Sequence, residues 1–486
     1  MQFTAHTPTI TDGNVLASIT WIATGSSLLA YAVALAWLSH RTASSLMDVE
    51  LAATWLVAFS VPVGLVYLFG LWPITRKRST KMMFVSIIVV GFAMRAIILT
   101  SPPSLEYDFL RYLWDGAVTA HGLDPYRYSP TQVLWASVGA ETVPPEFLQL
   151  ATEAGPVFEK INNPRLTTIY PPIAQLAFAT AHWIAPWSTY SWRVVLLLAD
   201  GVTLVILLRL LSFLGLSSAA IAWYWWNPIL LRETYGGAHM DVLTLPFVMG
   251  AVLLATRKRF NWSMFFLALA GGVKLWPILL APVLLRPLFA SPSRLISPVV
   301  MLLATTLIVW MPTMPSAFGP DSGFLAYAAG WQNNAGAFPL VESILGRALA
   351  FVGNSKVHLA GPMTRGLMGA LLAAWIAWQT RRGIADGRDV LRRCLMIVAS
   401  LFLISPTQFP WYYAWLVPFL AIMPSTALLA YAALLPLYYV HARHPAIAWL
   451  EHGPVWFLLI RGLVAGYRAT PDHRVICSTA YPEPTN

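Results

Sequence analysis

The chain has 486 residues, of which 57% are hydrophobic and only 11% are charged, and its mean hydropathy is +0.63. A soluble domain carries roughly a quarter charged residues, so this composition excludes a soluble globular protein and predicts an all-α polytopic membrane protein. The net charge of +10 sits largely in short clusters, which excludes a nucleic-acid surface, and two cysteines exclude a disulfide framework.

Apolar runs recur along nearly the whole chain, and most approach the length of about 20 residues that crosses a bilayer. The runs are residues 15–38, 51–72, 82–100, 194–216, 241–255, 295–310, 363–378 and 411–423. We expect about 11 to 13 spanning helices in one transmembrane domain, residues 1–468, with the first run retained as an anchor. The polar tail at residues 469–486 is expected to be disordered.

Clusters of basic residues predict which loops face the cytoplasm. They are Arg76-Lys77-Arg78 with Lys81, Arg257-Lys258-Arg259, and Arg381-Arg382 with Arg388, Arg392 and Arg393. Residues 101–170 then form a large extracytoplasmic loop. The segment around residues 232–241 also faces outward, provided that 171–187 enters and returns or lies along the interface. A second extracytoplasmic loop is expected at residues 312–360. The predicted location is the inner (plasma) membrane, with the polar loops on its extracytoplasmic side.

The segment 107–128, YDFLRYLWDGAVTAHGLDPYRY, concentrates charges and aromatic rings directly after an apolar run. Asp108, Arg111, Tyr112 and Asp115 are spaced i, i+3, i+4 and i+7, which predicts an amphipathic helix with one polar stripe. The stripe faces an aqueous cavity in one interpretation. In the other, of equal weight from spacing alone, it meets water at the membrane interface.

Transfer of a sugar from a lipid phosphate requires few side chains. One carboxylate takes the proton of the attacking hydroxyl, and cations stabilise the departing phosphate. Asp108 or Asp115 can supply the carboxylate. The candidate cations are Arg111, Arg127, Arg232, His239 and Lys274.

Lys274 lies in the middle of an apolar stretch, where an unpaired charge costs several kcal/mol. The preceding Gly271-Gly272 and following Pro277 predict that residues 261–288 form two half-helices. Lys274 is therefore expected to bind a phosphate or a counter-ion, with snorkelling to the interface as the alternative. For the His239-Met240-Asp241 turn, a functional role and a helix-dipole role of Asp241 are equal alternatives.

Two further loops, residues 331–334 and 408–413, combine aromatic rings with side-chain amides, a chemistry that suits sugars. An interfacial aromatic belt explains the rings about as well. The candidate sugar-binding or acceptor-binding residues are Tyr112, Tyr126, Gln332, Asn333, Gln408, Trp411 and Tyr412.

The motifs YDFLRYLWDG, GLDPYRYSP, INNPRLTTIYPPIAQ, GGAHMD, GGVKLWP and PTQFPWYYAW occur in this order between residue 107 and about residue 415. Together they resemble bacterial membrane glycosyltransferases of the GT-C superfamily, in particular the polyprenol-phosphate-mannose-dependent mannosyltransferases. The resemblance implies a GT-C-like helical bundle, a polyprenyl-phosphate sugar donor with its tail in the bilayer, and a lipid-linked or envelope glycan acceptor.

By position, the resemblance also implies that Asp108 is the catalytic base, with Asp115 as second choice. Some relatives carry two carboxylates separated by one residue, and Asp108 and Asp115 do not form such a pair. This departure favours a reaction without cofactor or metal, although a requirement for Mg²⁺ or Mn²⁺ stays open.

Three functions compete. An inverting mannosyltransferase is the leading hypothesis. A transporter or flippase of a lipid-linked or polar solute also uses broken helices and buried charges, but its expected inverted repeats are not detectable in the hydropathy. A ligase or polymerase acting on lipid-diphosphate glycans is the third, and it requires a larger donor pocket.

Overall fold

The computed structural model describes residues 12–75, 79–319, 322–441 and 446–468. In these ranges every regular element is a helix, and the β-type pairing is an isolated bridge between Asn333 and Thr407. The predicted all-α polytopic membrane fold is confirmed. The tail expected to be disordered, 469–486, lies outside the described residues.

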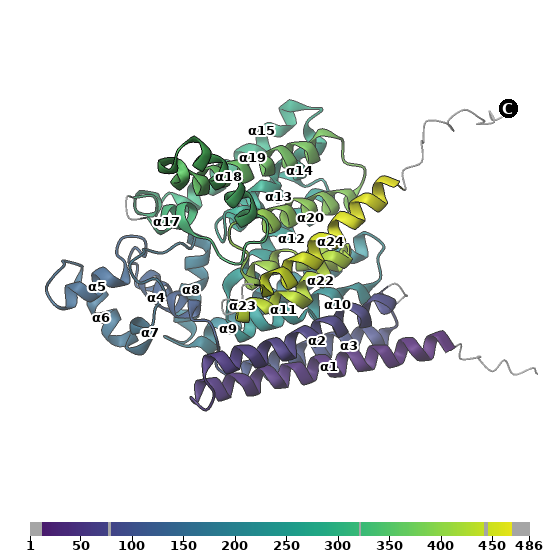
Figure 1. Cartoon of the computed structure of the whole chain (residues 1–486), viewed down its shortest axis with the longest axis horizontal. Coiled ribbons are helices and arrows are strands. Elements are labelled where there is room, and N and C mark those ends of the chain that lie inside the picture. The colour runs from purple at the N-terminus through teal and green to yellow at the C-terminus, as the bar shows by residue number, and fades with distance from the viewer. Residues whose placement is uncertain (1–11, 76–78, 320–321, 442–445, 469–486) are drawn as a thin grey trace, which may run out of the picture.

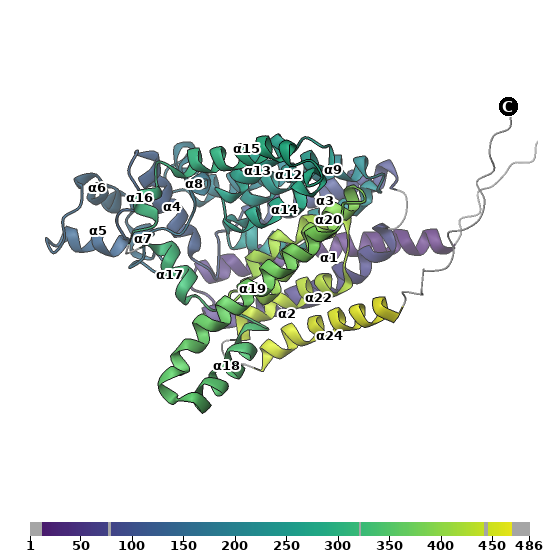
Figure 2. The ribbon, with the colours of Figure 1, turned by 90° about the horizontal axis from the view of Figure 1, so that it is seen from above.

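Three long helices at the N-terminal side pack together: α1 (Asp12–Ala43), α2 (Val49–Thr75) and α3 (Lys81–Leu99). Figures 1 and 2 show them side by side along the long axis of the molecule. Thr80 caps α3 by accepting a hydrogen bond from the backbone N–H of Met83, and the helix runs without a break to Leu99. The chain therefore reaches residue 101 at the end opposite to Lys81.

Short helices fill the predicted loop: α4 (Asp108–Ala120), α5 (Pro130–Ser137), α6 (Pro145–Ala154) and α7 (Pro156–Glu159), followed by α8 (Pro172–Ile184). They lie at the end of the molecule away from the start of α1 (Figure 1). With 13 residues, α8 is too short to cross a bilayer, as the prediction for 171–187 required.

The predicted amphipathic helix is α4, but its polar stripe does not meet bulk water, because the whole stretch from Phe109 to Val118 is buried. Packing against α8 is close: a Cβ on Gly116 would lie 2.5 Å from the carbonyl oxygen of Phe178. Of the four residues of the polar stripe, Asp108 alone is not buried, with 25% of its side chain exposed.

Helix α9 (Thr189–Phe213) carries a buried charge that is fully paired. Arg95 Nε on α3 lies 2.7 Å from Asp200 Oδ2, and the hydroxyls of Tyr224 and Tyr235 donate to the same carboxylate at 2.5 and 2.6 Å. A paired and hydrogen-bonded carboxylate is what a membrane interior tolerates. The cluster joins α3, α9 and the segment that follows α9.

Two apolar segments of the middle region are broken. The first consists of η1 (Ser218–Ile221), α10 (Ala222–Trp225), α11 (Pro228–Leu231), η2 (Arg232–Gly236), η3 (Met240–Thr244) and α12 (Leu245–Thr256), and it bends by 107° between Gly236 and Met240. The second consists of α13 (Phe260–Gly271), η4 (Trp276–Leu280), α14 (Ala281–Leu285) and η5 (Arg286–Leu288). The two half-helices predicted across 261–288 are thus confirmed.

The C-terminal half completes the bundle. Its helices are α15 (Pro292–Trp310), α16 (Met314–Ala317), α17 (Gly323–Gly330), α18 (Phe338–Val352), η6 (Asn354–Leu359), α19 (Ala360–Arg381), α20 (Gly387–Ile404), η7 (Pro410–Trp415), α21 (Val417–Ile422), α22 (Thr426–Leu434), η8 (Leu435–Leu437), α23 (Tyr438–His441) and α24 (Ile447–Arg468). Figure 2 shows α18 and α19 side by side, with α24 along the same side of the molecule as α22.

The number of long apolar helices is smaller than the expected 11 to 13. Among the described residues, six are long and apolar enough to cross a membrane, or seven with the bent pair counted as one span. The reason is local: the apolar runs at 241–255 and 411–423 are divided into short helices, η3 with α12 and η7 with α21. Apolar composition predicted membrane segments there but not their breaks.

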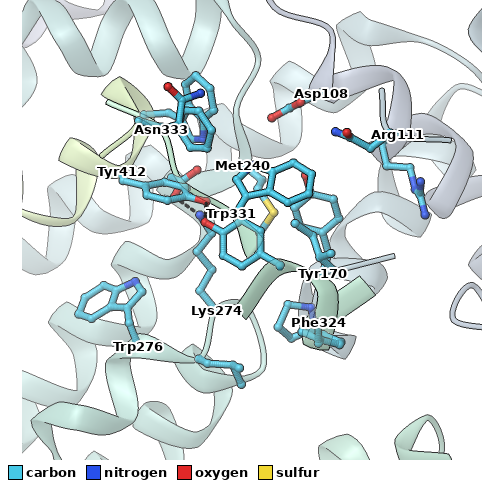
Figure 3. Close-up of a pocket in the computed structure, with 18 of the residues that line it drawn as sticks. Asp108, Arg111, Tyr170, Met240, Lys274, Trp276, Phe324, Trp331, Asn333 and Tyr412 are labelled. Atoms are coloured by element: carbon cyan, nitrogen blue, oxygen red, sulfur yellow. Dashed lines mark hydrogen bonds and ion pairs between the residues drawn. The ribbon is translucent and has the colours of Figure 1, made fainter. Parts of the chain in front are cut away.

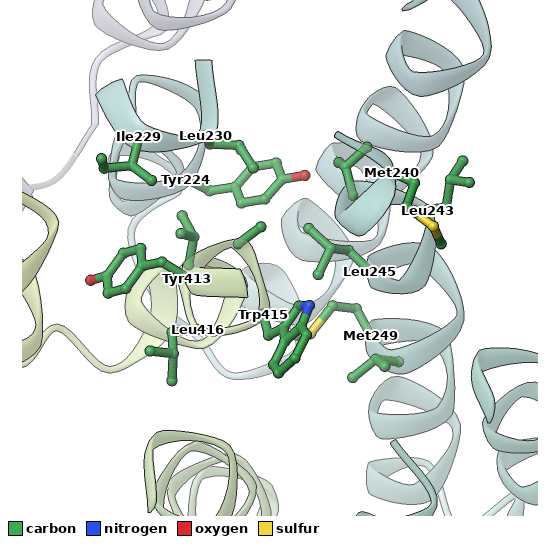
Figure 4. Close-up of a cluster of buried hydrophobic side chains, with 14 of the residues drawn as sticks. Tyr224, Ile229, Leu230, Met240, Leu243, Leu245, Met249, Tyr413, Trp415 and Leu416 are labelled. Carbon is green, nitrogen blue, oxygen red and sulfur yellow. The ribbon is translucent and has the colours of Figure 1, made fainter. Parts of the chain in front are cut away.

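The core lies where these broken segments meet. In Figure 4, Ile229 and Leu230 of α11 face Tyr413 and Leu416 of the η7 region, beside Leu245 of α12. The ends of short helices leave backbone N–H and C=O groups without partners inside the helix. In an apolar core these groups need hydrogen bonds from neighbouring buried polar groups. The same junction forms one wall of the cavity described next.

Candidate active site

A cavity of about 490 Å³ lies between α4, η3 and the link from α13 to η4. Its size falls within the usual range for small-molecule sites. Figure 3 labels ten lining residues: Asp108, Arg111, Tyr170, Met240, Lys274, Trp276, Phe324, Trp331, Asn333 and Tyr412. Segments on both sides of the chain's midpoint therefore contribute charged, amide and aromatic side chains to one chamber.

Asp108 is the first residue of α4 and lines this cavity, with 25% of its side chain exposed. The Asn162 amide donates to its Oδ1 at 3.2 Å, and His239 Nδ1 lies 3.8 Å from its Oδ2. Burial raises the pKa of the Asp108 carboxyl above its ordinary value, while the Asn162 hydrogen bond and Lys274 oppose the rise. A carboxylate with a raised pKa is suited to accept a proton near neutral pH.

Glu106 lies two residues before Asp108 and also lines the cavity. Burial, together with the charge of Asp108, raises the pKa of Glu106 to about 8, so it is mostly protonated at neutral pH. The sequence interpretation compared only Asp108 with Asp115 and concluded that two carboxylates separated by one residue were absent. That conclusion is wrong, since Glu106 and Asp108 form such a pair.

Asp115, the second candidate base, is fully engaged. Arg111 Nε lies 2.9 Å from Asp115 Oδ1, and Thr168 and Gln175 donate to Oδ2 at 2.5 and 3.4 Å. Asp115 is 1% exposed, whereas Arg111 reaches the cavity wall and also donates to the Leu166 carbonyl at 3.0 Å. The pair ties α4 to the segment before α8, so the structure places Asp115 in a supporting position.

Lys274 lies in the link between α13 and η4 and lines the cavity. Its Nζ is 2.5 Å from Asp241 Oδ1, an oxygen that also accepts from Trp415 Nε1 at 2.7 Å. The ammonium lies 3.8 Å from the centre of the Tyr412 ring. The sequence left open whether Lys274 binds a phosphate or a counter-ion, and the structure shows Asp241 as its counter-ion. Lys274 nevertheless also lines the cavity.

Arg232 and His239 lie behind the cavity wall. Arg232 is 2% exposed, donates to the Ser104 carbonyl at 3.1 Å and faces the Tyr439 ring at 5.1 Å. His239 is 1% exposed and stacks on Trp411, with 3.8 Å between ring centres and 8° between planes. Of the expected phosphate-binding residues, the structure therefore brings Arg111 and Lys274 to the cavity and holds Arg232 and His239 one layer back.

Four of the seven candidate sugar-binding residues line the cavity: Tyr112, Asn333, Trp411 and Tyr412. The hydroxyl groups of Tyr412 and Tyr327 are hydrogen-bonded at 2.7 Å. Trp411 stacks on Phe409 at 4.3 Å as well as on His239. The loops that carry these residues thus present flat aromatic surfaces to the chamber.

The other three are held elsewhere. Gln332 is exposed and donates to Glu342 at 3.2 Å. Gln408 is buried and binds the Leu403 carbonyl at 3.0 Å. Tyr126 is buried, with its hydroxyl 2.6 Å from the Tyr170 carbonyl.

Arg127, considered as a further cation, is exposed. Within the described ranges, no group of three or more His, Cys, Asp or Glu side chains is arranged to hold a metal ion. Metal independence remains a prediction, although the Glu106–Asp108 pair removes the departure on which it rested.

Comparison with known proteins places the chain in a family. The family model for the N-terminal domain of alpha-(1->6)-mannopyranosyltransferases (MptA_B family) matches residues 14–289, which is more than half of the chain. The chain belongs to this family. Alpha-(1->6)-mannopyranosyltransferase A of Corynebacterium glutamicum is 22% identical over 378 residues, covering 70% of this chain and 72% of that protein. No solved structure matches the chain.

The resemblance to membrane mannosyltransferases is thereby confirmed, and the chain is a multi-pass membrane mannosyltransferase. The family match includes Asp108, His239 and Lys274.

Sequence reasoning missed two polar residues of the site, Glu106 and Asn162. Each lies inside or beside one of the motifs named in the sequence analysis. Residue spacing does not predict, however, that Asn162 hydrogen-bonds to Asp108, which is 54 positions away.

Proposed function

We propose that this mannosyltransferase is inverting and transfers mannose from a polyprenyl-monophosphate donor to a lipid-linked or envelope glycan. The observation that carries the proposal is the placement of Asp108 and Lys274 in the wall of one cavity. We place the reaction at the extracytoplasmic face of the plasma membrane, because the site lies at the α4–α8 end, opposite to the basic Lys81.

The donor end of the cavity is the one that contains Lys274. Beside it the lining is apolar, with Leu275, Trp276 and Leu401, and Leu275 is 52% exposed. An exposed apolar side chain next to a cation suits the junction of a lipid tail and its phosphate. Lys274 and Arg111 would then stabilise the charge of the departing phosphate.

The acceptor hydroxyl is bound beside Asp108. As its oxygen attacks C1 of the sugar, the bond between C1 and the phosphate oxygen breaks on the opposite side, so the configuration inverts. The hydroxyl proton moves to Asp108, and the electron pair of the broken bond leaves with the lipid phosphate. The Asn162 amide orients the Asp108 carboxylate by donating a hydrogen bond of 3.2 Å to its Oδ1.

The test is donor consumption by the purified protein with radiolabelled polyprenyl-phosphate mannose, glucose or arabinose. Mannose should be consumed preferentially. Asp108→Asn should lower turnover by about 10²-fold to 10⁴-fold, the usual contribution of a general base. Glu153→Gln is the matched control, because this carboxylate belongs to the same region but is exposed on α6, and its activity should equal that of the unchanged protein.

Full activity of Asp108→Asn would show that Asp108 is not the general base. Movement of the intact donor across the bilayer, with no release of lipid phosphate, would favour the transporter or flippase instead.

A further inference from the structure

His239 occupies an unusual position for a buried imidazole. The side chain is 1% exposed, and among the described residues neither of its ring nitrogens has a hydrogen-bond partner. Leaving a buried polar group unpaired costs about 1–3 kcal/mol. A ring with two such nitrogens beside a reaction chamber calls for a functional explanation.

Each nitrogen faces a carboxylate at nearly contact distance. Nδ1 lies 3.8 Å from Asp108 Oδ2, and Nε2 lies 3.8 Å from Glu233 Oε2. Glu233 is 2% exposed, and the Tyr439 hydroxyl lies 2.9 and 3.1 Å from its two oxygens. The imidazole therefore connects a carboxylate in the cavity to one that is buried behind it.

The local fold fixes the ring in this orientation. The chain bends by 107° between Gly236 and Met240, and Ala238 has a φ of 58°. A Cβ on Gly237 would lie 2.7 Å from His239 Cδ2 and 3.1 Å from Arg232 Nη1, so only glycine fits there. With Trp411 stacked on its face, the ring presents its edges to the two carboxylates.

We propose that His239 is a relay and positioning residue that links Asp108 to Glu233. The inference rests on the proposed function, because Asp108 has to be the base. After Asp108 takes the hydroxyl proton, Oδ2 passes it to Nδ1 of His239 while Nε2 passes its own proton to Oε2 of Glu233. The reverse transfer returns the proton to Asp108, which releases it to water in the cavity after the products leave.

The distances permit this step after a small contraction, since hydrogen bonds at catalytic sites are often longer before substrate binds. The charged groups facing His239 are Asp108 of α4, Glu233 and Arg232 of η2, and Lys274 of the α13–η4 link. Lys274 is itself paired with Asp241, whose Oδ1 lies 2.5 Å from its Nζ. A neutral imidazole in this setting has one N–H and one free nitrogen, as a relay requires.

The experiment compares pH–rate profiles of the unchanged protein, His239→Gln, Glu233→Gln and the double variant, with radiolabelled polyprenyl-phosphate mannose as donor. His239→Gln should lower kcat by about tenfold or more and move the acid limb of the profile to lower pH by about one unit, because Nδ1 no longer accepts the proton of Asp108 and no longer stabilises the protonated carboxyl. KM for the donor should change less than about twofold, since His239 lies behind the cavity wall.

The double variant provides the decisive comparison. If Glu233 acts through His239, Glu233→Gln changes the profile in the unchanged background and adds nothing in the His239→Gln background. Glu233→Gln preserves the shape of the side chain, so its profile tests the relay even if His239→Gln does not fold.

The possible failures are distinguishable. If the unchanged protein consumes no donor, the proposed function and the relay both fall. If the donor is consumed and Asp108→Asn is inactive, but His239→Gln lowers the rate equally at every pH, the relay alone is overturned. Equal effects of Glu233→Gln in both backgrounds would overturn it as well.

Discussion

At the level of single residues, environment separates two aspartates that sequence spacing could not. Both lie on α4, and burial raises the pKa of each carboxyl. The oxygens of Asp115 are occupied by Arg111, Thr168 and Gln175, whereas Asp108 has Asn162 and an open cavity. A base has to be reachable by its substrate, so this difference in access supports the proposed role of Asp108.

The Lys274–Asp241 pair allows the effects on folding and on catalysis to be separated. Lys274→Ala should destabilise the protein by about 3–5 kcal/mol, because it leaves Asp241 buried and unpaired. Lys274→Met combined with Asp241→Asn removes both charges and should recover most of that loss. Donor turnover should stay at least about tenfold below normal in both variants, because the phosphate has lost its cation.

Thermal unfolding in detergent and donor turnover measure the two effects. Recovery of turnover in the double variant would show that Lys274 serves folding alone.

At the level of elements, the cavity wall depends on loops that are tied together from behind. The backbone N–H of Asn333 donates to the Pro406 carbonyl and that of Gln408 to the Asn333 carbonyl, both at 2.9 Å. Asn334 Nδ2 donates to Glu451 of α24 at 2.7 Å. The buried amides thus align the loop that presents Trp411 instead of meeting the sugar themselves.

Glu451→Ala should weaken substrate binding without touching the substrate, because Asn334 loses its direct hydrogen bond to α24 and keeps only the one to the Gln408 carbonyl. We expect kcat/KM to fall about tenfold, equivalent to ~1.4 kcal/mol, mainly through KM. Glu451→Gln retains an acceptor for Asn334 and should stay within about threefold of normal. Steady-state kinetics on both variants decide, and equal losses would indicate that the charge, and not the hydrogen bond, matters.

At the level of the whole molecule, long helices hold a one-sided site. The start of α1 and the end of α24 lie at one end, and α4 to α7 lie at the other (Figures 1 and 2). The helices that pass between these ends are lipid-facing in part, with exposed side chains such as Phe69 and Val89. The α4 end of the molecule, whose first residue Asp108 lines the chamber, thus lies opposite to the two chain ends, which supports the proposed one-sided site.

Cysteine labelling tests this arrangement. In a chain with Cys477 replaced by serine, Cys394 remains but is buried. Glu153→Cys on α6 should react with a membrane-impermeant maleimide in sealed right-side-out vesicles, and Arg259→Cys, in the exposed turn before α13, should react only after permeabilisation. The reverse pattern would place the site in the cytoplasm.

Much of the architecture was predictable because it follows from composition. Long uninterrupted runs gave α1, α2, α3, α9 and α15, and Gly271-Gly272 with Pro277 gave the break beside Lys274. The bend between Gly236 and Met240 was not predicted, and in the structure Arg232 and the His239 ring pack closely against Gly237 at this point. Glu106 was overlooked although it stands two residues from Asp108.

The sequence by itself determined that this is an all-helical membrane protein with an acidic and aromatic motif after its third apolar run, because hydropathy and local spacing act over neighbouring residues. Only the tertiary structure decided which charges share a chamber. Asp108 contacts Asn162 and His239, and Lys274 contacts Asp241. These pairs are between 33 positions (Asp241 and Lys274) and 131 positions (Asp108 and His239) apart along the chain. Packing of broken helices creates those contacts, and no local pattern encodes them.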